Sequence, residues 1–274
     1  MCVDNDGDVV WEKLVNAVQD QMVSDFIFRT SKEEGVGVQD REEALKIIAC
    51  TSRSSQNQSL SQAEQETHNL MCACQQLEDV LFECRENDQA SVGLIDVQCM
   101  VQCLNKKLLC NVDLQGKTKA GTFSTESRVT TYKGRVHEYP LFDTPKEVYD
   151  AVLLVVDRYN SLLHAIKDLA SPVEKLTSLY KCAAWLLFEL VSLHPFSDGN
   201  GRVSRLLCNY CLRTVTPFST PLHSINGGKV QENYIDAIVA AHESKHRHPV
   251  DLTCLLVESS WKTWGDFMKQ IQPS

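Results

Sequence analysis

The sequence lacks an excess of positive charge. Its 274 residues include 27 lysines and arginines against 36 aspartates and glutamates, which gives a formal net charge of −9. A protein that binds duplex nucleic acid usually neutralises backbone phosphates with clustered lysine and arginine, and no dense basic stripe is present here. We therefore expect no nucleic acid among the partners of this chain.

Long hydrophobic runs and targeting signals are also missing. The longest strongly apolar run, residues 182–193, falls well short of the roughly 20 residues that a membrane-spanning helix needs. The first residues contain neither the basic nor the apolar segment of a secretory signal peptide. Cys2 stands where N-myristoylation requires glycine. These absences predict that a membrane is not a partner.

Cysteine is abundant, with 12 residues, but this chain does not look like the small secreted proteins in which many cysteines form disulfides. The chain is large and shows no export signal, so we expect reduced thiols that act as small hydrophobic side chains rather than disulfides. Four of them fall inside apolar helical patterns and are expected to be buried: Cys99, Cys103, Cys182 and Cys208. The CxxC formed by Cys208 and Cys211 lacks a second pair, which disfavours a structural zinc site.

The rest of the composition is that of an ordinary globular protein, with 43% hydrophobic and 23% charged residues. Apolar residues recur at helical spacing along most of the chain. Helices are expected in residues 8–29, 70–81, 94–109, 145–162, 172–193 and 202–215, after Gly227-Gly228 through about Ala241, and after Pro249. Residues 51–62 are predicted to form a polar loop, and residues 111–145, rich in β-formers and punctuated by glycine, a β-hairpin. The predicted fold class is all-α with one β-hairpin.

The residues that carry chemistry concentrate between His194 and Arg205, in the run HPFSDGNGRVSR. Two glycines in this run allow the backbone to approach a ligand closely. The run opens a predicted helix, whose free N–H groups and positive dipole end attract anions. Arg202 lies three residues before Arg205, so both can face one anion from the same side of that helix. The segment therefore predicts a phosphate-binding cradle.

A base and a metal ligand accompany the cradle. His194 ends a buried helix, and histidine is the residue type best suited to take a proton from a hydroxyl near neutral pH. Asp198 supplies the hard oxygen ligand that Mg²⁺ prefers. The alternative is a turn between two helices with incidental charges. The concentration of a base, a metal ligand, two glycines and two arginines in one short segment favours the cradle.

The same segment fits the pattern HPFxDGNGRxxR at every specified position, and on this motif the chain resembles the Fic (Fido) domain family. The resemblance extends over residues 60–258 and implies a Fic-type helical bundle with one β-hairpin, called the flap. Fic enzymes similar to this chain transfer AMP from ATP to a Ser, Thr or Tyr hydroxyl of a target protein and release pyrophosphate. ATP and Mg²⁺ are the implied substrate and cofactor.

The resemblance assigns roles within the motif. It implies that His194 is the general base and that Asp198 holds Mg²⁺. It also implies that the nucleotide is bound by Asp198, Gly199, Asn200, Gly201, Arg202, Val203, Ser204 and Arg205.

The hairpin resembles the Fic flap, which clamps a target segment by strand addition. Val129, Thr130 and Thr131 would form this clamp beside the nucleotide. Strand addition is recognised mainly through the backbone, so the flap does not identify the target. The family often has Gly-x-Phe-Arg just before the flap, whereas this chain ends the corresponding run Gly121–Ser124 with serine.

Two residues in the second half of the chain bear on how the adenine ring of ATP would be bound. Tyr234 falls where the family places an adenine contact, and a buried core aromatic is the alternative interpretation. His242 stands where many relatives have asparagine, so the adenine pocket is expected to differ here.

Residues 30–35, TSKEEG, fit the inhibitory pattern Ser/Thr-x-x-x-Glu-Gly/Asn that many Fic proteins carry. By this resemblance Glu34 would pair with Arg205 and occupy the place that the ATP γ-phosphate needs. Glu33 is expected to point about 100° away by the helical period. The alternative interpretation is a charged surface turn.

These observations divide the chain into four parts: an N-terminal helical region with the inhibitory helix (1–59), the leading helix of the Fic core (60–93), the Fido domain (94–258) and a C-terminal helix end (259–274). The expected function is that of a protein adenylyltransferase, self-inhibited by Glu34, which could also remove AMP. The alternative is a catalytically weak nucleotide-binding or interaction module on a Fic fold. The expected partners are ATP and a target protein hydroxyl docked on the flap, and a homodimer is left open.

Animal relatives of the endoplasmic-reticulum type carry a membrane anchor and tetratricopeptide repeats, and neither is seen in this sequence, so a cytoplasmic or nuclear location is expected.

Overall fold

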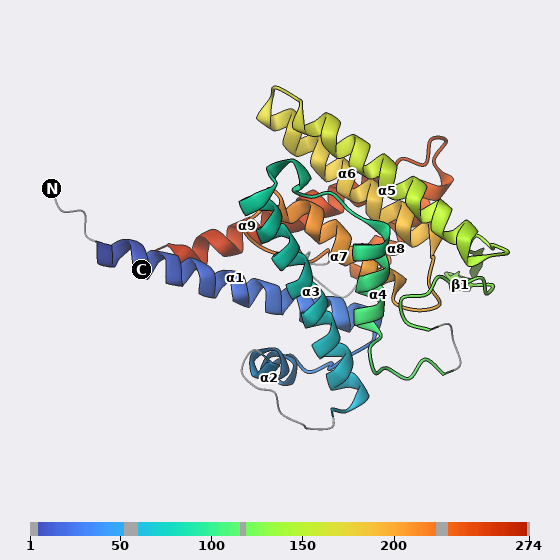
Figure 1. Cartoon of the computed structure of the whole chain (residues 1–274), viewed down its shortest axis with the longest axis horizontal. Coiled ribbons are helices and arrows are strands. Elements are labelled where there is room, and N and C mark those ends of the chain that lie inside the picture. Colours follow the sequence, from blue (N-terminus) through green and yellow to red (C-terminus); the bar gives the residue numbers. More distant parts are fainter. Residues whose placement is uncertain (1–4, 52–59, 116–118, 223–229, 273–274) are drawn as a thin grey trace.

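The computed structural model describes residues 5–51, 60–115, 119–222 and 230–272, and its regular structure is helical apart from one hairpin (Figure 1). Gly227-Gly228 and most of the loop expected at 51–62 lie outside the described residues. The elements in chain order are α1 (Asn5–Glu34), α2 (Arg41–Thr51), α3 (Gln62–Asn87), the 3₁₀ turn η1 (Gln89–Ser91), the π-helical turn η2 (Val97–Gln102), α4 (Cys103–Leu108), β1 (Val129–Tyr132), β2 (Arg135–Glu138), α5 (Pro145–Lys167), α6 (Pro172–Leu193), α7 (Asn200–Arg213), α8 (Val230–Glu243) and α9 (Val250–Ile271). The predicted class, all-α with one antiparallel hairpin, is confirmed.

Local sequence signals fix where the two long central helices begin. The side chain of Thr144 accepts a hydrogen bond from the backbone N–H of Glu147 at the start of α5. Ser171 does the same for Glu174 at the start of α6, and each helix has proline at its first position. A capping oxygen satisfies a backbone donor that the helix itself cannot, while proline loses nothing where no intrahelical bond is available. Both helices therefore start where the sequence predicted.

Helix α2 was not among the helices predicted from the sequence. Its start carries a capping signal, because Asp40 accepts a hydrogen bond from the backbone N–H of Glu43. Its buried Ala44 packs with Phe28 of α1 and with Val38. Since a helix of this length is marginal in isolation, tertiary packing rather than a strong apolar period stabilises it.

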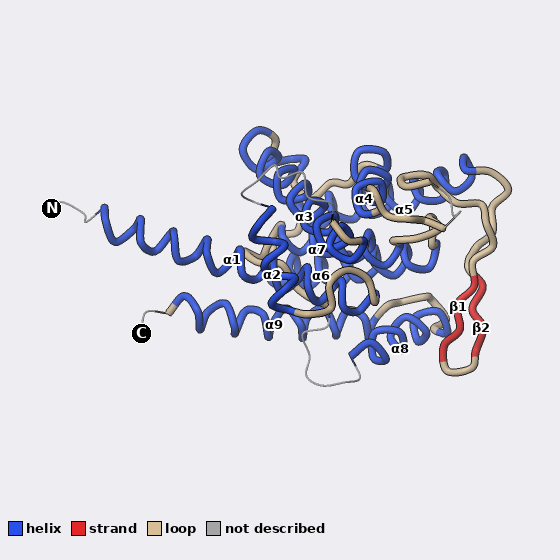
Figure 2. The backbone as a smooth tube through the Cα atoms, turned by 90° about the horizontal axis from the view of Figure 1, so that it is seen from below, coloured by secondary structure: helices blue, strands red, loops and turns tan. Residues whose placement is uncertain are grey.

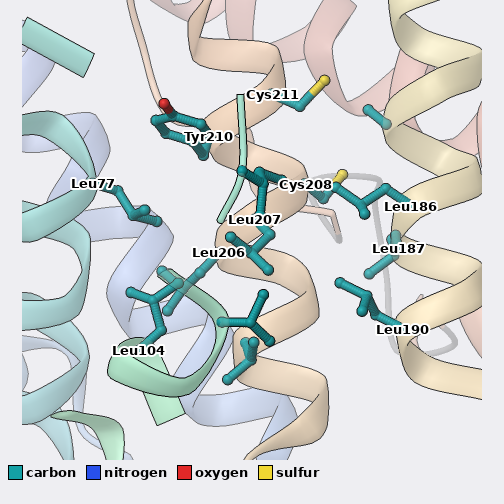
Figure 3. Close-up of a cluster of buried hydrophobic side chains, with 14 of the residues drawn as sticks. Leu77, Leu104, Leu186, Leu187, Leu190, Leu206, Leu207, Cys208, Tyr210 and Cys211 are labelled. Atoms are coloured by element: carbon teal, nitrogen blue, oxygen red, sulfur yellow. The ribbon is translucent and has the colours of Figure 1, made fainter. Parts of the chain in front are cut away.

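The core is built around α6 and α7, which pack against each other at the centre of the molecule (Figure 3). Leu186, Leu187 and Leu190 of α6 face the apolar side of α7, while α3 and α4 close the opposite side. Within the described residues, α6 is the helix that is long and apolar enough to cross a membrane by length and composition. Its contacts with α5, α7 and α9 account for that apolar character, since it is the central helix of the bundle.

The cysteine prediction holds for the central helices and is wrong elsewhere. Cys182 and Cys208 are buried, and the ten cysteines from Cys72 to Cys254 are free thiols. Cys99 and Cys103 are exposed. Their positions around the turn η2 and the start of α4 place Val97, Met100 and Leu104 inward instead. The π-helical turn changes the period by which residues 94–109 face the core, which a regular helical pattern could not show.

The two ends of the molecule have different roles. α1 and α9 lie side by side at one end, where the N- and C-termini also lie, and the β-hairpin lies at the other (Figures 1 and 2). Val18 and Met22 of α1 pack with Phe267 and Ile271 of α9. The C-terminal end of α1 contacts α7. A helix that packs against α9 around Val18 and Met22 therefore ends beside the loop between α6 and α7.

We predict that Leu187→Ala destabilises the protein by about 2–5 kcal/mol, because Leu187 is fully buried and truncation leaves a cavity in the core. Leu154→Ala is the matched control, since Leu154 is 72% exposed on α5 and its loss should cost under about 0.5 kcal/mol. Urea unfolding followed by circular dichroism measures both. Equal midpoints for the two variants would contradict the placement of α6 at the centre.

Candidate functional site

The loop between α6 and α7 is held in one conformation by its own backbone. His194 ends α6 with a left-handed backbone conformation at φ 51°, and Gly199 precedes α7 with φ 79°. The side-chain amide of Asn200 donates to the Phe196 carbonyl at 2.7 Å and accepts from the Phe196 N–H at 2.9 Å. Phe196 is buried against Phe123, with ring centroids 5.1 Å apart. The loop is therefore a rigid turn anchored in the core.

Two contacts from distant segments fix this turn from outside. Asn105 of α4 donates to the Asp198 carbonyl at 2.8 Å, and the N–H of Ser124, before the hairpin, donates to the Pro195 carbonyl at 2.9 Å. Such bonds satisfy backbone oxygens that the turn leaves outside any helix. The base of the flap and the loop thus form one unit.

The first two turns of α7 carry two buried guanidinium groups. Arg202 donates to Asp198 Oδ1 at 3.1 Å, but its Nε and Nη1 are buried and have no hydrogen-bond partner in the structure. The Nε of Arg205 is likewise buried, with no hydrogen-bond partner among the described residues. A buried donor without a partner costs about 1–3 kcal/mol. These unpaired donors at a helix N-terminus fit an anionic ligand with several oxygens, such as a polyphosphate.

One carboxylate already lies in this cradle. Glu34, at the end of α1, accepts a hydrogen bond from Arg205 Nη1 through Oε1. A Cβ atom added at Gly201 would lie only 2.9 Å from Glu34 Cδ and 3.0 Å from Oε2, so the carboxylate rests directly on the start of α7. Two independent observations therefore place the negative charge of Glu34 where the helix N-terminus and Arg205 attract anions.

The end of α1 is shaped to deliver this side chain. Gly35 follows the helix with φ +64°, and the N–H of Val36 donates to the Ser31 carbonyl at 3.1 Å, which closes the helix with a glycine C-cap. The next turn is tied to α3, since the N–H of Gly37 donates to Glu66 Oε2 at 2.6 Å. The glycine of the TSKEEG pattern thus has a structural reason, because a left-handed residue is required directly after Glu34.

A cavity of about 800 Å³ opens in front of the loop. It is bordered by the end of α1, the flap, the end of α6, the start of α7 and one side of α8. Of the residues predicted from the sequence, Glu34, Thr130, Thr131, His194, Gly201, Arg205, Tyr234 and His242 line it. The structure thus gathers residues separated by about 200 positions around one space.

Other predicted residues do not line this cavity. Val203 is buried on the packed side of α7, and Ser204 donates to the Asn200 carbonyl at 2.8 Å within the helix. The side chain of Asn200 binds the Phe196 backbone in the turn, and Val129 is exposed at the start of β1, at the base of the hairpin. Any nucleotide contact by Asn200, Val203 or Ser204 therefore has to come from the backbone rather than the side chain.

Asp198 is the predicted metal ligand. Its side chain is 37% exposed, and Oδ1 accepts from the N–H of Gly199 at 2.6 Å and from Arg202. The carboxylate is thus oriented by its neighbours while part of it faces solvent beside the anion cradle. This arrangement fits a Mg²⁺ ion that also contacts phosphate oxygens.

The catalytic candidate His194 is held as a neutral imidazole. Its Nδ1 lies 3.4 Å from the Val191 carbonyl, and since a carbonyl can only accept, Nδ1 carries the proton and Nε2 keeps its lone pair. Burial lowers the pKa of His194 to about 4, and the nearby guanidinium of Arg128 acts in the same direction. The group is therefore unprotonated and able to accept a proton throughout the neutral range.

Two residues of the flap were missed by the sequence analysis. Tyr139, which follows β2, stacks on the imidazole of His194 with centroids 3.8 Å apart. Arg128, which precedes β1, donates to the carbonyls of Ser124 at 2.8 Å and Pro140 at 3.0 Å, and so joins the two legs of the hairpin. Ser124, where the family often has arginine, is fully buried here. Arg128 therefore supplies a guanidinium at the flap base from four residues further along.

Tyr234 and His242 lie on the α8 side of the cavity. The guanidinium of Arg205 lies 5.1 Å above the Tyr234 ring, and burial raises the pKa of Tyr234 to about 12. Tyr234 is therefore a buried aromatic, as the alternative interpretation expected, and it also borders the cavity; its contact with adenine stays a prediction. His242 Nε2 lies 3.0 Å from the Ser192 hydroxyl, and burial lowers its pKa to about 4.

The expectation that Glu33 points away from the cavity is wrong. Glu33 and Glu34 both line it, because the end of α1 enters the cavity rim rather than passing beside it. Neighbouring side chains 100° apart on a helix can both face a space that surrounds the helix end.

Comparisons with known proteins identify the family and the fold of this chain. The sequence model of the Fic/DOC family matches residues 123–212. A Fido domain-containing protein from Dictyostelium discoideum is 30% identical over 135 residues, which cover 48% of this chain and 85% of that protein. A Fic domain-containing signaling protein from Bacteroides thetaiotaomicron shares the fold with a TM-score of 0.63 at 19% identity, over 95% of this chain and 91% of that one. Fic-1 from Caenorhabditis elegans also has a TM-score of 0.63, at 18% identity, over 94% of this chain and 66% of that one.

We predict that Tyr139→Ala raises the pKa of His194 from about 4 toward its ordinary value, because the stacked ring is part of what shields the imidazole from water. Histidine NMR titration measures this shift, with assignment by His194→Gln. Tyr132→Ala is the control, since Tyr132 lines the same cavity without stacking on His194. A His194 that titrates identically in wild type and Tyr139→Ala would contradict the role given to the stacked ring.

Proposed function

Because the chain belongs to the Fic/DOC family, whose members are typically AMPylating transferases, we propose that it is a protein adenylyltransferase that Glu34 restrains. In this proposal AMP moves from ATP to a Ser, Thr or Tyr hydroxyl of a target protein. The observation that carries the proposal is the set of buried donors on Arg202 and Arg205 that have no partner among the described residues, with Arg205 and a neutral His194 lining the same cavity. Donors of this kind fit a polyphosphate, and the histidine fits a proton acceptor next to it.

The reaction follows from the positions of these groups. The triphosphate would lie across the start of α7, with its oxygens accepting from Arg202, Arg205 and the free N–H groups of the helix. A target hydroxyl oxygen would attack the α-phosphorus while pyrophosphate leaves. His194 Nε2 would take the hydroxyl proton as the new P–O bond forms. A Mg²⁺ ion held by Asp198 would neutralise phosphate charge.

The target would reach this point along the flap. β1 and β2 form a two-stranded sheet, so one edge of β1 has no strand partner among the described residues. Thr130 and Thr131 of that strand line the cavity that contains His194. An extended segment added to this edge would carry its side chains past the base. The exposed strand supplies backbone hydrogen bonds rather than a pocket for one residue, which suits several targets.

In this proposal Glu34 restrains the reaction because its carboxylate competes with the triphosphate for Arg205. Its carboxylate uses Arg205, one of the cations that the triphosphate needs, and covers Gly201 at the helix start. A charge-assisted contact of this kind contributes about 1.5–3 kcal/mol. ATP would therefore bind in a pose unsuited to transfer until α1 withdraws the side chain. The same carboxylate beside the phosphate site also suits removal of AMP, in which a water replaces the target hydroxyl.

The competing proposal is a nucleotide-binding or interaction module without turnover. The two proposals differ in one measurement, the appearance of label on protein from ATP labelled in the α-phosphate. ATP binding by calorimetry with no label, even when Glu34 is removed, would favour the module.

We predict that His194→Ala reduces AMP transfer by at least about 100-fold, since positioned proton transfer contributes about 10²–10⁴ in rate. ATP affinity should differ from that of the wild type by no more than a few-fold, because Arg202 and Arg205, not His194, would bind the phosphates. The assay uses auto-AMPylation in a Glu34→Gly background, with calorimetry for ATP. Equal labelling with and without His194 would remove its role as base.

We also predict that Glu34→Gly raises auto-AMPylation by at least about tenfold, since loss of about 1.4 kcal/mol of competition changes the competent population tenfold. Lys32→Gly is the matched control, because Lys32 is an exposed residue in the same last turn and tests helix weakening alone. Glu33→Gly is unsuitable, since Glu33 lines the same cavity. Similar activation by Glu34→Gly and Lys32→Gly would mean that fraying of α1, rather than the carboxylate, controls activity.

A further inference from the structure

The base of the flap is built around one guanidinium group. Arg128 donates from Nη1 to the carbonyl of Ser124 at 2.8 Å and from Nη2 to the carbonyl of Pro140 at 3.0 Å. These two carbonyls belong to the two legs of the hairpin. A guanidinium carries five N–H donors in a fixed planar fork, so one side chain can bind two carbonyls at once. Lysine cannot replace this geometry, because its donors all lie on a single nitrogen.

Arg128 also binds the segment after β2 through its backbone. The N–H of Tyr139 donates to the Arg128 carbonyl at 3.0 Å. The N–H of Tyr139 and the carbonyl of the next residue, Pro140, are therefore bound by the same arginine. A proline also restricts the residue before it to extended conformations. The backbone that carries the Tyr139 ring is thus fixed by Arg128 and by Pro140.

The first leg of the hairpin connects Arg128 to the loop between α6 and α7. The N–H of Ser124 donates to the carbonyl of Pro195 at 2.9 Å, and Pro195 directly follows His194. On the other leg, the Tyr139 ring stacks on the His194 imidazole, with centroids 3.8 Å apart and planes inclined by 18°. The contacts form a closed circuit that begins and ends at His194 and passes through Pro195, Ser124, Arg128 and Tyr139. The guanidinium of Arg128 joins the two halves of this circuit.

We propose that Arg128 is a positioning residue that holds the ring of Tyr139 over the imidazole of His194. Arg128 acts through the flap and does not itself touch substrate. The stacked ring restrains the tilt of the imidazole, while the contact between Nδ1 and the Val191 carbonyl restrains its rotation. A proton acceptor needs both restraints to meet one hydroxyl oxygen in a productive geometry. The consequence for catalysis rests on the proposed function, whereas the stacking does not.

A purely electrostatic role is the alternative for Arg128. Burial of the imidazole is the largest cause of the low pKa of His194, about 4, and the nearby charged and titratable groups, Arg128, Asp198 and His137, contribute less. Tyr139 is neutral, because burial raises the pKa of its phenol. Since burial outweighs charge, the ring that covers the imidazole affects His194 more than the cation does.

NMR on the full chain without nucleotide tests the stacking. A stacked ring shifts the imidazole protons of His194 upfield, so loss of the stack moves them downfield. We expect Arg128→Lys to move them downfield and to raise the pKa of His194 above about 4, as Tyr139→Ala does. The lysine keeps the charge, and Arg128→Gln, which loses it, should give the same downfield movement. Arg85→Lys is the matched control, since Arg85 donates to the Arg213 carbonyl at 2.7 Å outside the cavity lining, and it should leave the signals unchanged.

A double-mutant cycle tests whether Arg128 acts through Tyr139. Arg128→Lys combined with Tyr139→Ala should give the same His194 signals as Tyr139→Ala alone, because the ring that the arginine positions is already absent. Additive changes overturn the proposal, and so do His194 signals that both variants at position 128 leave unchanged. A pKa of His194 that rises with Arg128→Gln and not with Arg128→Lys identifies a charge effect and overturns it too. Circular dichroism checks folding, and either folded variant decides the stacking.

The catalytic consequence is measured separately. In the Glu34→Gly background, Arg128→Lys should lower the rate of AMP transfer by at least about tenfold, since misplacing a reacting group by about 1 Å costs on the order of 100-fold. ATP affinity by calorimetry should change by no more than a few-fold, because Arg128 does not line the cavity. Unchanged transfer in a variant whose His194 signals have moved overturns the positioning role. No transfer by the Glu34→Gly protein itself would overturn the proposed function instead, while NMR still decides whether Arg128 positions Tyr139.

Discussion

The loop that joins α6 to α7 is the constraint on which the rest of the site depends. Two buried helices meet there, and the left-handed turns at His194 and Gly199 reverse the chain without leaving the core. The amide of Asn200 binds both backbone groups of Phe196, so the turn cannot shift without breaking two hydrogen bonds. The proposed function depends on this rigidity, because it fixes His194 at the end of α6 and the buried arginines at the start of α7. Preorganised groups of this kind act on a ligand without first being ordered.

Competition for one cation connects the N-terminal helix with this loop. Arg205 is buried, so its guanidinium has to be paired with some anion, and in this structure that anion is the carboxylate of Glu34. In the proposed function a triphosphate and Glu34 would compete for the same donors on Arg205. The affinity for the triphosphate and the stability of the end of α1 would then be coupled. Any change that loosens the glycine-capped end of α1, or its tie between Gly37 and Glu66, acts on the cradle from a distance.

Sequence reasoning succeeded where chemistry and local signals coincide. Caps at Thr144 and Ser171, the hairpin, and the run from His194 to Arg205 were all readable, because each depends on residues within a few positions of one another. It failed where the deciding partner is distant. α2 needs α1 and α3 to be stable, and Cys99 faces solvent because a π-helical turn changes the local period.

The sequence by itself determined the fold class and the family, because a long motif with fixed spacing constrains both backbone and chemistry. Tertiary structure alone decided which groups share the cavity. The stacking of Tyr139 on His194 brings together residues of the flap and of α6, and Arg128 occupies the flap base although the arginine usual in the family is replaced by Ser124. It also placed Glu33 beside Glu34 at the cavity rim. Such contacts depend on the packing of whole helices, which no local pattern of residues specifies.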